Sequence, residues 1–153
     1  MANIVFNIAK GRVVEYYNRV ENNDPTNSAL ILVPIETSGL ESDATLIDKD
    51  DLAAVLSGTT NEQTTMGRKT LTDTELAALP APVDGSDYYE VSLPQVTWTA
   101  ATGNAISKIL VCYDPDTTGG TDSAIIPLTM FDAVVTPDGT DLILATGAFF
   151  RAS

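Results

Sequence analysis

Histidine is absent from this sequence, and Cys112 is its only cysteine. Without histidine the chain lacks the commonest general base and the commonest metal ligand of proteins, so neither a Ser-His-Asp nor a Cys-His catalytic arrangement exists. A lone cysteine also excludes a disulfide within the chain. Because Cys112 lies in the apolar run KILVCYD, we expect it to be a buried small hydrophobe.

Positive charge is scarce: 8 lysines and arginines stand against 21 aspartates and glutamates, for a net charge of -13. Nucleic-acid affinity comes mainly from lysine and arginine on phosphate, so we expect no nucleic-acid partner. No stretch approaches the ~20 apolar residues that a membrane-spanning helix needs, and the start MANIVFNIAKGR lacks the pattern of a signal peptide. We therefore expect no membrane partner and assembly in a cytosol.

The G-x-S-x-G, P-loop and G-x-G-x-x-G motifs are missing as well. With this many acidic residues, chance pairs of carboxylates are expected, and a glycosidase pair would need a spacing in space that the sequence does not show. We expect a protein that is not an enzyme and binds no cofactor.

The remaining composition is that of an ordinary globular protein, with 44% hydrophobic and 19% charged residues in a chain of 153. There is no internal repeat and no convincing boundary, so we predict a single domain, 1–153.

In the first half of the chain, residues 2–8 alternate like a short strand, and the spacing of apolar residues over 11–22 is helical. Residues 28–36 form a buried strand pattern in which Pro34 indicates an edge or a kink. The stretch DKDDLAAVLSG predicts a short helix, which Asp48 or Asp50 could cap.

After Pro82 the pattern changes to strands separated by turn signals: DYYEVSLPQVTWTA, ISKILVCYD, SAIIPLTMFDAVVT and DLILATGAFF. Strands spaced in this way favour an antiparallel fold. We predict a mainly β protein, a β-sandwich or jelly-roll-like fold with an N-terminal helix and one or two short helices. An α+β fold is the second choice.

Residues 57–75, SGTTNEQTTMGRKTLTDTE, are rich in threonine and carry Arg68 and Lys69, the only adjacent basic pair. Threonine favours extended structure, and long irregular segments in small domains are usually functional or disordered. We interpret the segment as an extended arm or a loop that contacts a partner; a mobile surface loop is the alternative.

The tail 147–153 carries Phe149 and Phe150 side by side. Neighbouring side chains on a strand point to opposite faces, so one core would bury both only if the strand were covered on each side. We interpret the tail as a second partner contact, with Arg151 beside the two aromatic rings.

Asp114, Asp116 and Asp122 lie in the glycine-containing stretch DPDTTGGTD, and calcium favours clustered oxygen ligands. As an EF-hand loop the stretch is incomplete, because Ile125 stands where the bidentate glutamate belongs. We favour a hairpin loop with solvated aspartates, and keep the three residues as a weak candidate metal site. Trp98 is similarly interpreted as a core residue in preference to a carbohydrate platform.

Four stretches resemble small structural proteins of tailed bacteriophages: MANIVFNIAKGRVVEYYNRV, SGTTNEQTTMGRKTLTDTELAALPAP, TWTAATGNAISKILVCYDPDTTGGTD and FFRAS. The resemblance extends over nearly the whole chain and is to capsid cement, or decoration, proteins of short-tailed and contractile-tailed phages. It carries no catalytic motif.

The resemblance implies a β-rich, jelly-roll-like virion protein on the capsid exterior, assembled in the reducing bacterial cytoplasm. It implies a homotrimer that binds the major capsid protein and staples neighbouring capsid subunits. For this interface we nominate residues of the threonine-rich segment and the tail, with residues 2–8 as a weaker candidate for pairing with a neighbour's sheet: Thr59, Thr60, Asn61, Glu62, Arg68, Lys69, Phe149, Phe150 and Arg151.

Two alternatives remain open at this point. The first is another place in the virion, at the neck, the tail or a head fibre. The second is a calcium- or carbohydrate-binding module that uses the Asp114 loop or Trp98.

Overall fold

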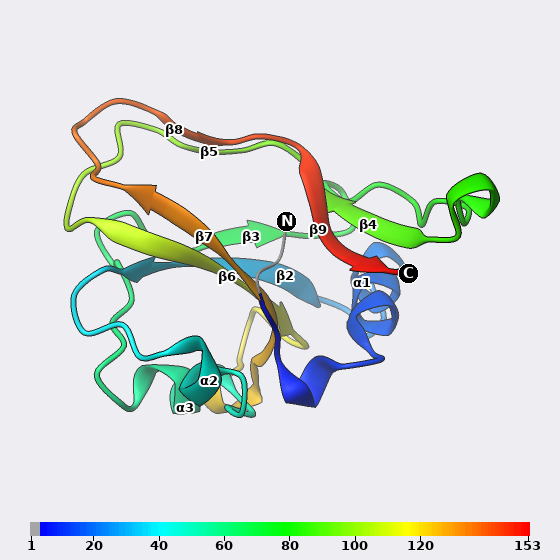
Figure 1. Cartoon of the computed structure of the whole chain (residues 1–153), viewed down its shortest axis with the longest axis horizontal. Helices are drawn as coiled ribbons and strands as arrows, with labels where there is room; N and C mark the ends of the chain where they lie inside the picture. Colours follow the sequence, from blue (N-terminus) through cyan, green and yellow to red (C-terminus); the bar gives the residue numbers. More distant parts are fainter. Residues whose placement is uncertain (1–3) are drawn as a thin grey trace.

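A five-stranded antiparallel sheet forms the centre of the computed structural model, which describes residues 4–153 (Figure 1). The strand order is β1-β7-β6-β2-β3. The bounds of these strands are β1 Ile4–Val5, β2 Ala29–Glu36, β3 Lys69–Leu71, β6 Ile106–Asp114 and β7 Ile126–Val135.

Two shorter antiparallel ribbons form a second β layer. One pairs β4 (Tyr89–Leu93) with β9 (Gly147–Ala152), and the other pairs β5 (Val96–Trp98) with β8 (Leu142–Leu144). The three α-helices are α1 (Val13–Glu21), α2 (Asp43–Leu46) and α3 (Leu52–Leu56), and single 3-10 turns lie at Asn7–Ala9, Asp84–Ser86 and Asp122–Ala124.

Strands make up 35% of the described residues, and α-helices and 3-10 turns together make up 18%. This confirms the prediction of a mainly β, antiparallel fold with an N-terminal helix and short helices.

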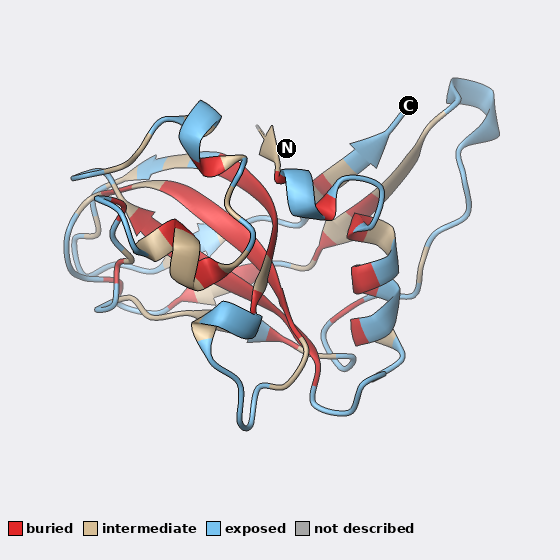
Figure 2. Cartoon of the chain, turned by 90° about the horizontal axis from the view of Figure 1, so that it is seen from below, coloured by how far each residue is buried: buried red, intermediate tan, exposed pale blue. Residues whose placement is uncertain are grey.

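Both faces of the central sheet are apolar, and each has its own core. On β6, Ile109 and Val111 pack with α1 and the two ribbons, while Leu110 and Cys112 pack with α2 and α3 (Figures 1 and 2). Side chains on both faces of β6 are buried, so polar residues do not alternate with apolar ones along this strand. This explains the continuous apolar run within KILVCYD. Cys112 is fully buried as expected, and burial raises the pKa of its thiol.

The helix predicted over 11–22 is confirmed as α1. Its buried stripe consists of Val13, Tyr16, Tyr17 and Val20, and Tyr16 stacks on Tyr113 of β6 with the ring centroids 4.7 Å apart. Both tyrosines are therefore packing residues of the helix.

The cap of α3 differs from the prediction. Asp51, rather than Asp48 or Asp50, accepts the backbone N–H of Ala54 at 2.7 Å. The reason is positional: Asp51 directly precedes the first helical residue, Leu52, so its carboxylate lies beside the free N–H groups of the first turn. Helix α2, whose N-cap is Ser42, was not predicted from the sequence.

Pro34 does not mark an edge strand, because β2 lies between β6 and β3. Strand β3 pairs only with Leu30–Leu32, so it ends before Pro34. The carbonyl of Pro34 instead accepts the backbone N–H of Gln63 at 2.9 Å. A strand residue directs its N and its carbonyl to the same side, so the missing N–H of Pro34 lies on the side of Gln63, whose carbonyl accepts the backbone N–H of Gly67 at 3.3 Å instead.

The strand expected over 2–8 is shorter than predicted. Residues 2 and 3 lie outside the described part of the chain, and β1 ends at Val5. The N–H of Phe6 still donates to the carbonyl of Leu128 at 3.0 Å, and its ring is buried under the sheet. The chain then turns away through Asn7–Ala9, because the N–H of Asn7 donates to Ile47 rather than to β7.

The buried C-terminal strand generates the first prediction. Phe149 is 1% exposed and lies 6.1 Å from Tyr17 between ring centroids, so Phe149→Ala should lower the free energy of unfolding by about 3–5 kcal/mol. Phe150 is only partly buried, and Phe150→Ala should cost roughly 1–2 kcal/mol. Urea unfolding followed by circular dichroism measures both. Equal losses for the two variants would contradict the packing described here.

Candidate interaction surfaces

Residues 57–75 fold back against the sheet. Thr60 and Gln63 are both 1% exposed. The hydroxyl of Thr60 donates to Glu41 Oε2 at 3.0 Å and accepts the backbone N–H of Glu41 at 3.1 Å. Thr60 is thus committed to contacts within the chain and offers no surface to a partner.

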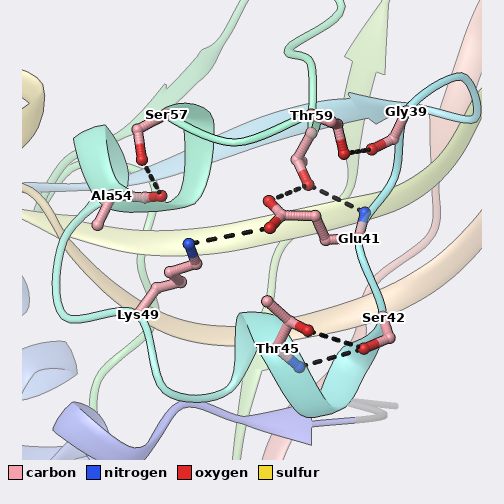
Figure 3. A network of polar contacts seen from close by, with 9 residues as sticks. Gly39, Glu41, Ser42, Thr45, Lys49, Ala54, Ser57 and Thr59 are labelled. Carbon is pink, nitrogen blue, oxygen red and sulfur yellow. Dashed lines mark hydrogen bonds and ion pairs between the residues drawn. The ribbon is translucent and has the colours of Figure 1, made fainter.

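The neighbouring Thr59 is exposed, but its hydroxyl donates to the carbonyl of Gly39 at 2.7 Å (Figure 3). The two backbones approach so closely that a Cβ on Gly39 would lie 2.1 Å from the carbonyl oxygen of Thr59. Gly39 also has a φ of +80°, which side chains rarely adopt. The start of the threonine-rich segment is therefore held in place by residues 39–41.

Arg68 forms the strongest polar contact of this segment. Its guanidinium donates two hydrogen bonds to Glu62, at 2.8 and 2.6 Å, and two to Asp122, at 2.7 and 3.0 Å. Such paired bonds between guanidinium and carboxylate have the best geometry of any ion pair in proteins. Hydrogen bonding to Arg68 lowers the pKa of Asp122. The positive charge of Arg68 is therefore balanced by two carboxylates of the same chain.

Lys69 begins β3, and its ammonium lies 5.9 Å from the centre of the Trp98 ring. The indole N–H of Trp98 donates to the carbonyl of Gly67 at 2.9 Å, and the ring is 2% exposed. Trp98 is a core residue, as expected.

The tail is the strand β9, which pairs with β4. Phe149 belongs to the core on the α1 side of the sheet, and Phe150 is partly buried beside it. The guanidinium of Arg151 lies over the ring of Tyr88, 3.7 Å from its centre. A partner role for the residues nominated from the sequence stays a prediction. Thr59, Asn61 and Arg151 are exposed, whereas Thr60 and Phe149 are buried.

The three aspartates of the glycine-containing loop are not gathered around one point. Asp114 accepts the backbone N–H of Asp116, Asp116 accepts both the N–H and the hydroxyl of Thr118, and Asp122 faces Arg68. Within residues 4–153, no group of three or more histidine, cysteine, aspartate or glutamate side chains is placed to hold a metal ion.

Two features were missed by the sequence analysis. One is Lys108, a lysine in the middle of β6 that is only 8% exposed and lies 3.0 Å from Asp43 and 2.8 Å from Asp132. A lysine within an otherwise apolar strand is a signal that could have indicated a buried ion pair.

The other feature is a hollow of about 380 Å³ between the segment 82–89 and the end of β9. It is formed by residues far apart in the sequence, so no local pattern indicated it. Of the helices in the described part of the chain, none has the length and apolar character that a membrane span requires.

No family model, no curated protein and no solved structure matches this chain. The sequence resemblance and the placement of the surface residues are therefore the observations that bear on its function.

The Arg68 contacts generate the second prediction. Arg68→Met leaves Glu62 and Asp122 without their partner, so the free energy of unfolding should fall by about 1–3 kcal/mol. Urea unfolding followed by Trp98 fluorescence measures the change. The control is Arg19→Met, which removes an exposed ion pair with Glu15 and should cost less than about 1 kcal/mol. A loss no larger than that of the control would show that the Arg68 contacts are not stabilising.

The lowered pKa of Asp122 generates the third prediction. When the pKa of a carboxyl is lower in the folded than in the unfolded state, the carboxyl stabilises the protein at pH values above its unfolded-state pKa. This stabilisation is lost as the pH falls through its folded-state pKa. The free energy of unfolding should therefore fall below about pH 4. Other carboxyls act in the same direction, so the measurement is the difference in slope between the wild type and Arg68→Met. The variant should have the shallower slope, and identical slopes would contradict the prediction.

Proposed function

We propose that this protein is a structural component of the virion of a tailed bacteriophage, a cement protein that binds the outside of the capsid and staples neighbouring major capsid subunits. It acts without catalysis and forms a symmetric oligomer, a homotrimer. The observation that carries this proposal is the resemblance of four stretches, extending over nearly the whole chain, to small phage structural proteins.

The way the chain is tied together supports a role as a brace. Arg68 joins the threonine-rich segment to the 3-10 turn at Asp122–Ala124, and Lys108 joins β6 to Asp43 at the start of α2 and to Asp132 of β7. Each link joins separate segments of the chain. A protein that transmits force between two neighbours benefits from such links, because they resist the displacement of one element against another.

The charge also suits this role. A net charge of -13 keeps the free protein soluble at high concentration and opposes binding to the packaged genome. The chain needs no disulfide, which fits assembly in a reducing cytoplasm. Repulsion between copies then has to be offset by contacts with the shell.

Two exposed apolar side chains are candidates for such contacts. Val134, near the end of β7, is 83% exposed, and Ile143, in β8, is 58% exposed. A single apolar residue on a surface is unremarkable, and a contact of this size binds weakly. Symmetric oligomerisation sums several weak contacts into firm attachment, which is how a small cement protein would hold a shell.

The fourth prediction tests the proposal on particles. Purified virions should carry this protein in roughly hundreds of copies on the outside of the head, in proportion to the capsid subunits. Quantitative mass spectrometry gives the copy number, and a low-resolution particle image gives the position. Particles assembled without the protein should lose their genome at a lower temperature and recover when the purified protein is added.

A copy number of about six or twelve would place the protein in the neck or the tail instead, where rings of that symmetry occur. Absence from purified particles would refute a virion role of any kind.

A further inference from the structure

The hollow of about 380 Å³ lies where the ribbon β4–β9 extends beyond the central sheet. The segment before β4 folds back on itself: the N–H of Val83 donates to the carbonyl of Tyr88 at 2.9 Å, and residues Asp84–Ser86 form a 3-10 turn between them. Figure 1 shows this turn at the far end of the molecule, and Figure 2 shows that its residues are exposed. A partner can therefore reach the hollow without any rearrangement of the fold.

The lining combines apolar walls with carboxylates. Pro82, Tyr88 and Tyr89 contribute carbon surface, and Val83 is 39% exposed although it is a large aliphatic residue. Asp84 and Asp87 also line the hollow, and both are exposed. Among the described residues that line it, none is basic. Arg151 brings one positive charge to the Tyr88 ring, and the two aspartates outnumber it. Apolar walls beside this excess of negative charge suit a ligand that has an aliphatic stem and a cationic head.

The aromatic ring of the hollow already makes such a contact within the chain. The guanidinium of Arg151 lies 3.7 Å from the centre of the Tyr88 ring. A guanidinium stacks on an aromatic face and forms paired hydrogen bonds with carboxylates, whereas an ammonium is a compact and strongly hydrated point charge. The combination of tyrosines with Asp84 and Asp87 therefore favours arginine over lysine.

Each arginine of a second copy already has a partner within its own chain. All four of its arginines lie within the described residues, and each is engaged within its own chain. Arg12 and Arg19 pair with Glu15, Arg68 pairs with Glu62 and Asp122, and Arg151 lies over Tyr88. The net charge of -13 further opposes the approach of a second copy to two more carboxylates. These contacts and the net charge favour an occupant from a different protein.

We propose that the hollow at the end of the β4–β9 ribbon binds an arginine side chain of a partner protein. The stem of the arginine packs on Val83 and Tyr88, and its guanidinium is held by Asp84 and Asp87. The site adds a specific partner contact to the proposed function. The identification of that partner as a capsid subunit rests on the proposed function.

The fifth prediction is a direct binding measurement on the purified full chain. Nα-acetyl-arginine methylamide, added at about 150 mM salt, should cause saturable shifts of backbone amide signals that are confined to residues 82–89 and 151–153. Nα-acetyl-norleucine methylamide, which has an uncharged aliphatic side chain, should cause no saturable shift. The lysine analogue should bind more weakly than the arginine analogue, because an ammonium forms no paired hydrogen bonds with carboxylates.

Asp84→Asn with Asp87→Asn should weaken the binding of the arginine analogue roughly tenfold. The matched control is Asp50→Asn with Asp73→Asn, which removes the same charge from two exposed positions outside the hollow and should leave the affinity unchanged. Unchanged amide signals in the rest of the chain verify that each variant is folded. Absence of saturable shifts at 82–89, equal shifts with the norleucine analogue, or an unchanged affinity in Asp84→Asn with Asp87→Asn would overturn the site.

The binding measurement tests the site and the particle experiment tests the virion role, so either result can be negative without the other. If the arginine analogue binds as expected but virions lack the protein, the site stands and the proposed function falls. In a second outcome, virions carry the wild-type protein and also carry the double variant Asp84→Asn, Asp87→Asn in the same copy number. That result overturns the assignment of the capsid as the source of the arginine. Loss of occupancy in this variant, together with normal occupancy of Asp50→Asn with Asp73→Asn, supports the assignment.

Discussion

The burial of β6 on both faces is the constraint on which the rest of this structure depends. Its side chains pack alternately into two separate cores, so the sheet must be covered on both sides before either core excludes water. The chain provides one cover from α1 and the ribbons, and the other from α2, α3 and the segment around Phe6. These covers come from short elements that would not be stable alone, and their apolar residues become buried only on the sheet.

Polar contacts then position the segments that connect these covers. Arg68 and Lys108 each reach two carboxylates from other elements, and the backbone and side chain of Gln63 bond to Pro34 and Asn104. Lys108 and Gln63 are largely out of water, so leaving either of them unpaired would cost more than a pair on the open surface contributes. The long segment 57–75 is consequently part of the folded body, although its composition is that of a loop.

The sequence was sufficient to predict what depends on local patterns. The helix α1, the strand around Ala29–Glu36 and the β-rich second half follow from the spacing of apolar residues, and the burial of Cys112 follows from the run around it. Two errors are local, the cap of α3 and the missed helix α2, and the others concern tertiary partners. That Arg68 pairs with Asp122, or that Phe149 packs near Tyr17, depends on a chain path that brings together residues more than fifty positions apart. The hollow beside Tyr88 likewise depends on residues far apart in the sequence, because β9 forms one of its walls.

The pairing of early with late elements has a consequence for synthesis. Strand β1 pairs with β7, and the ring of Tyr17 lies beside that of Phe149. As the polypeptide emerges from the ribosome, β1 and the Tyr17 ring therefore lack these partners until β7 and β9 have been translated. Both cores include residues of β7, Leu128 and Phe131 in one and Met130 in the other, so neither core is complete before β7 has been made.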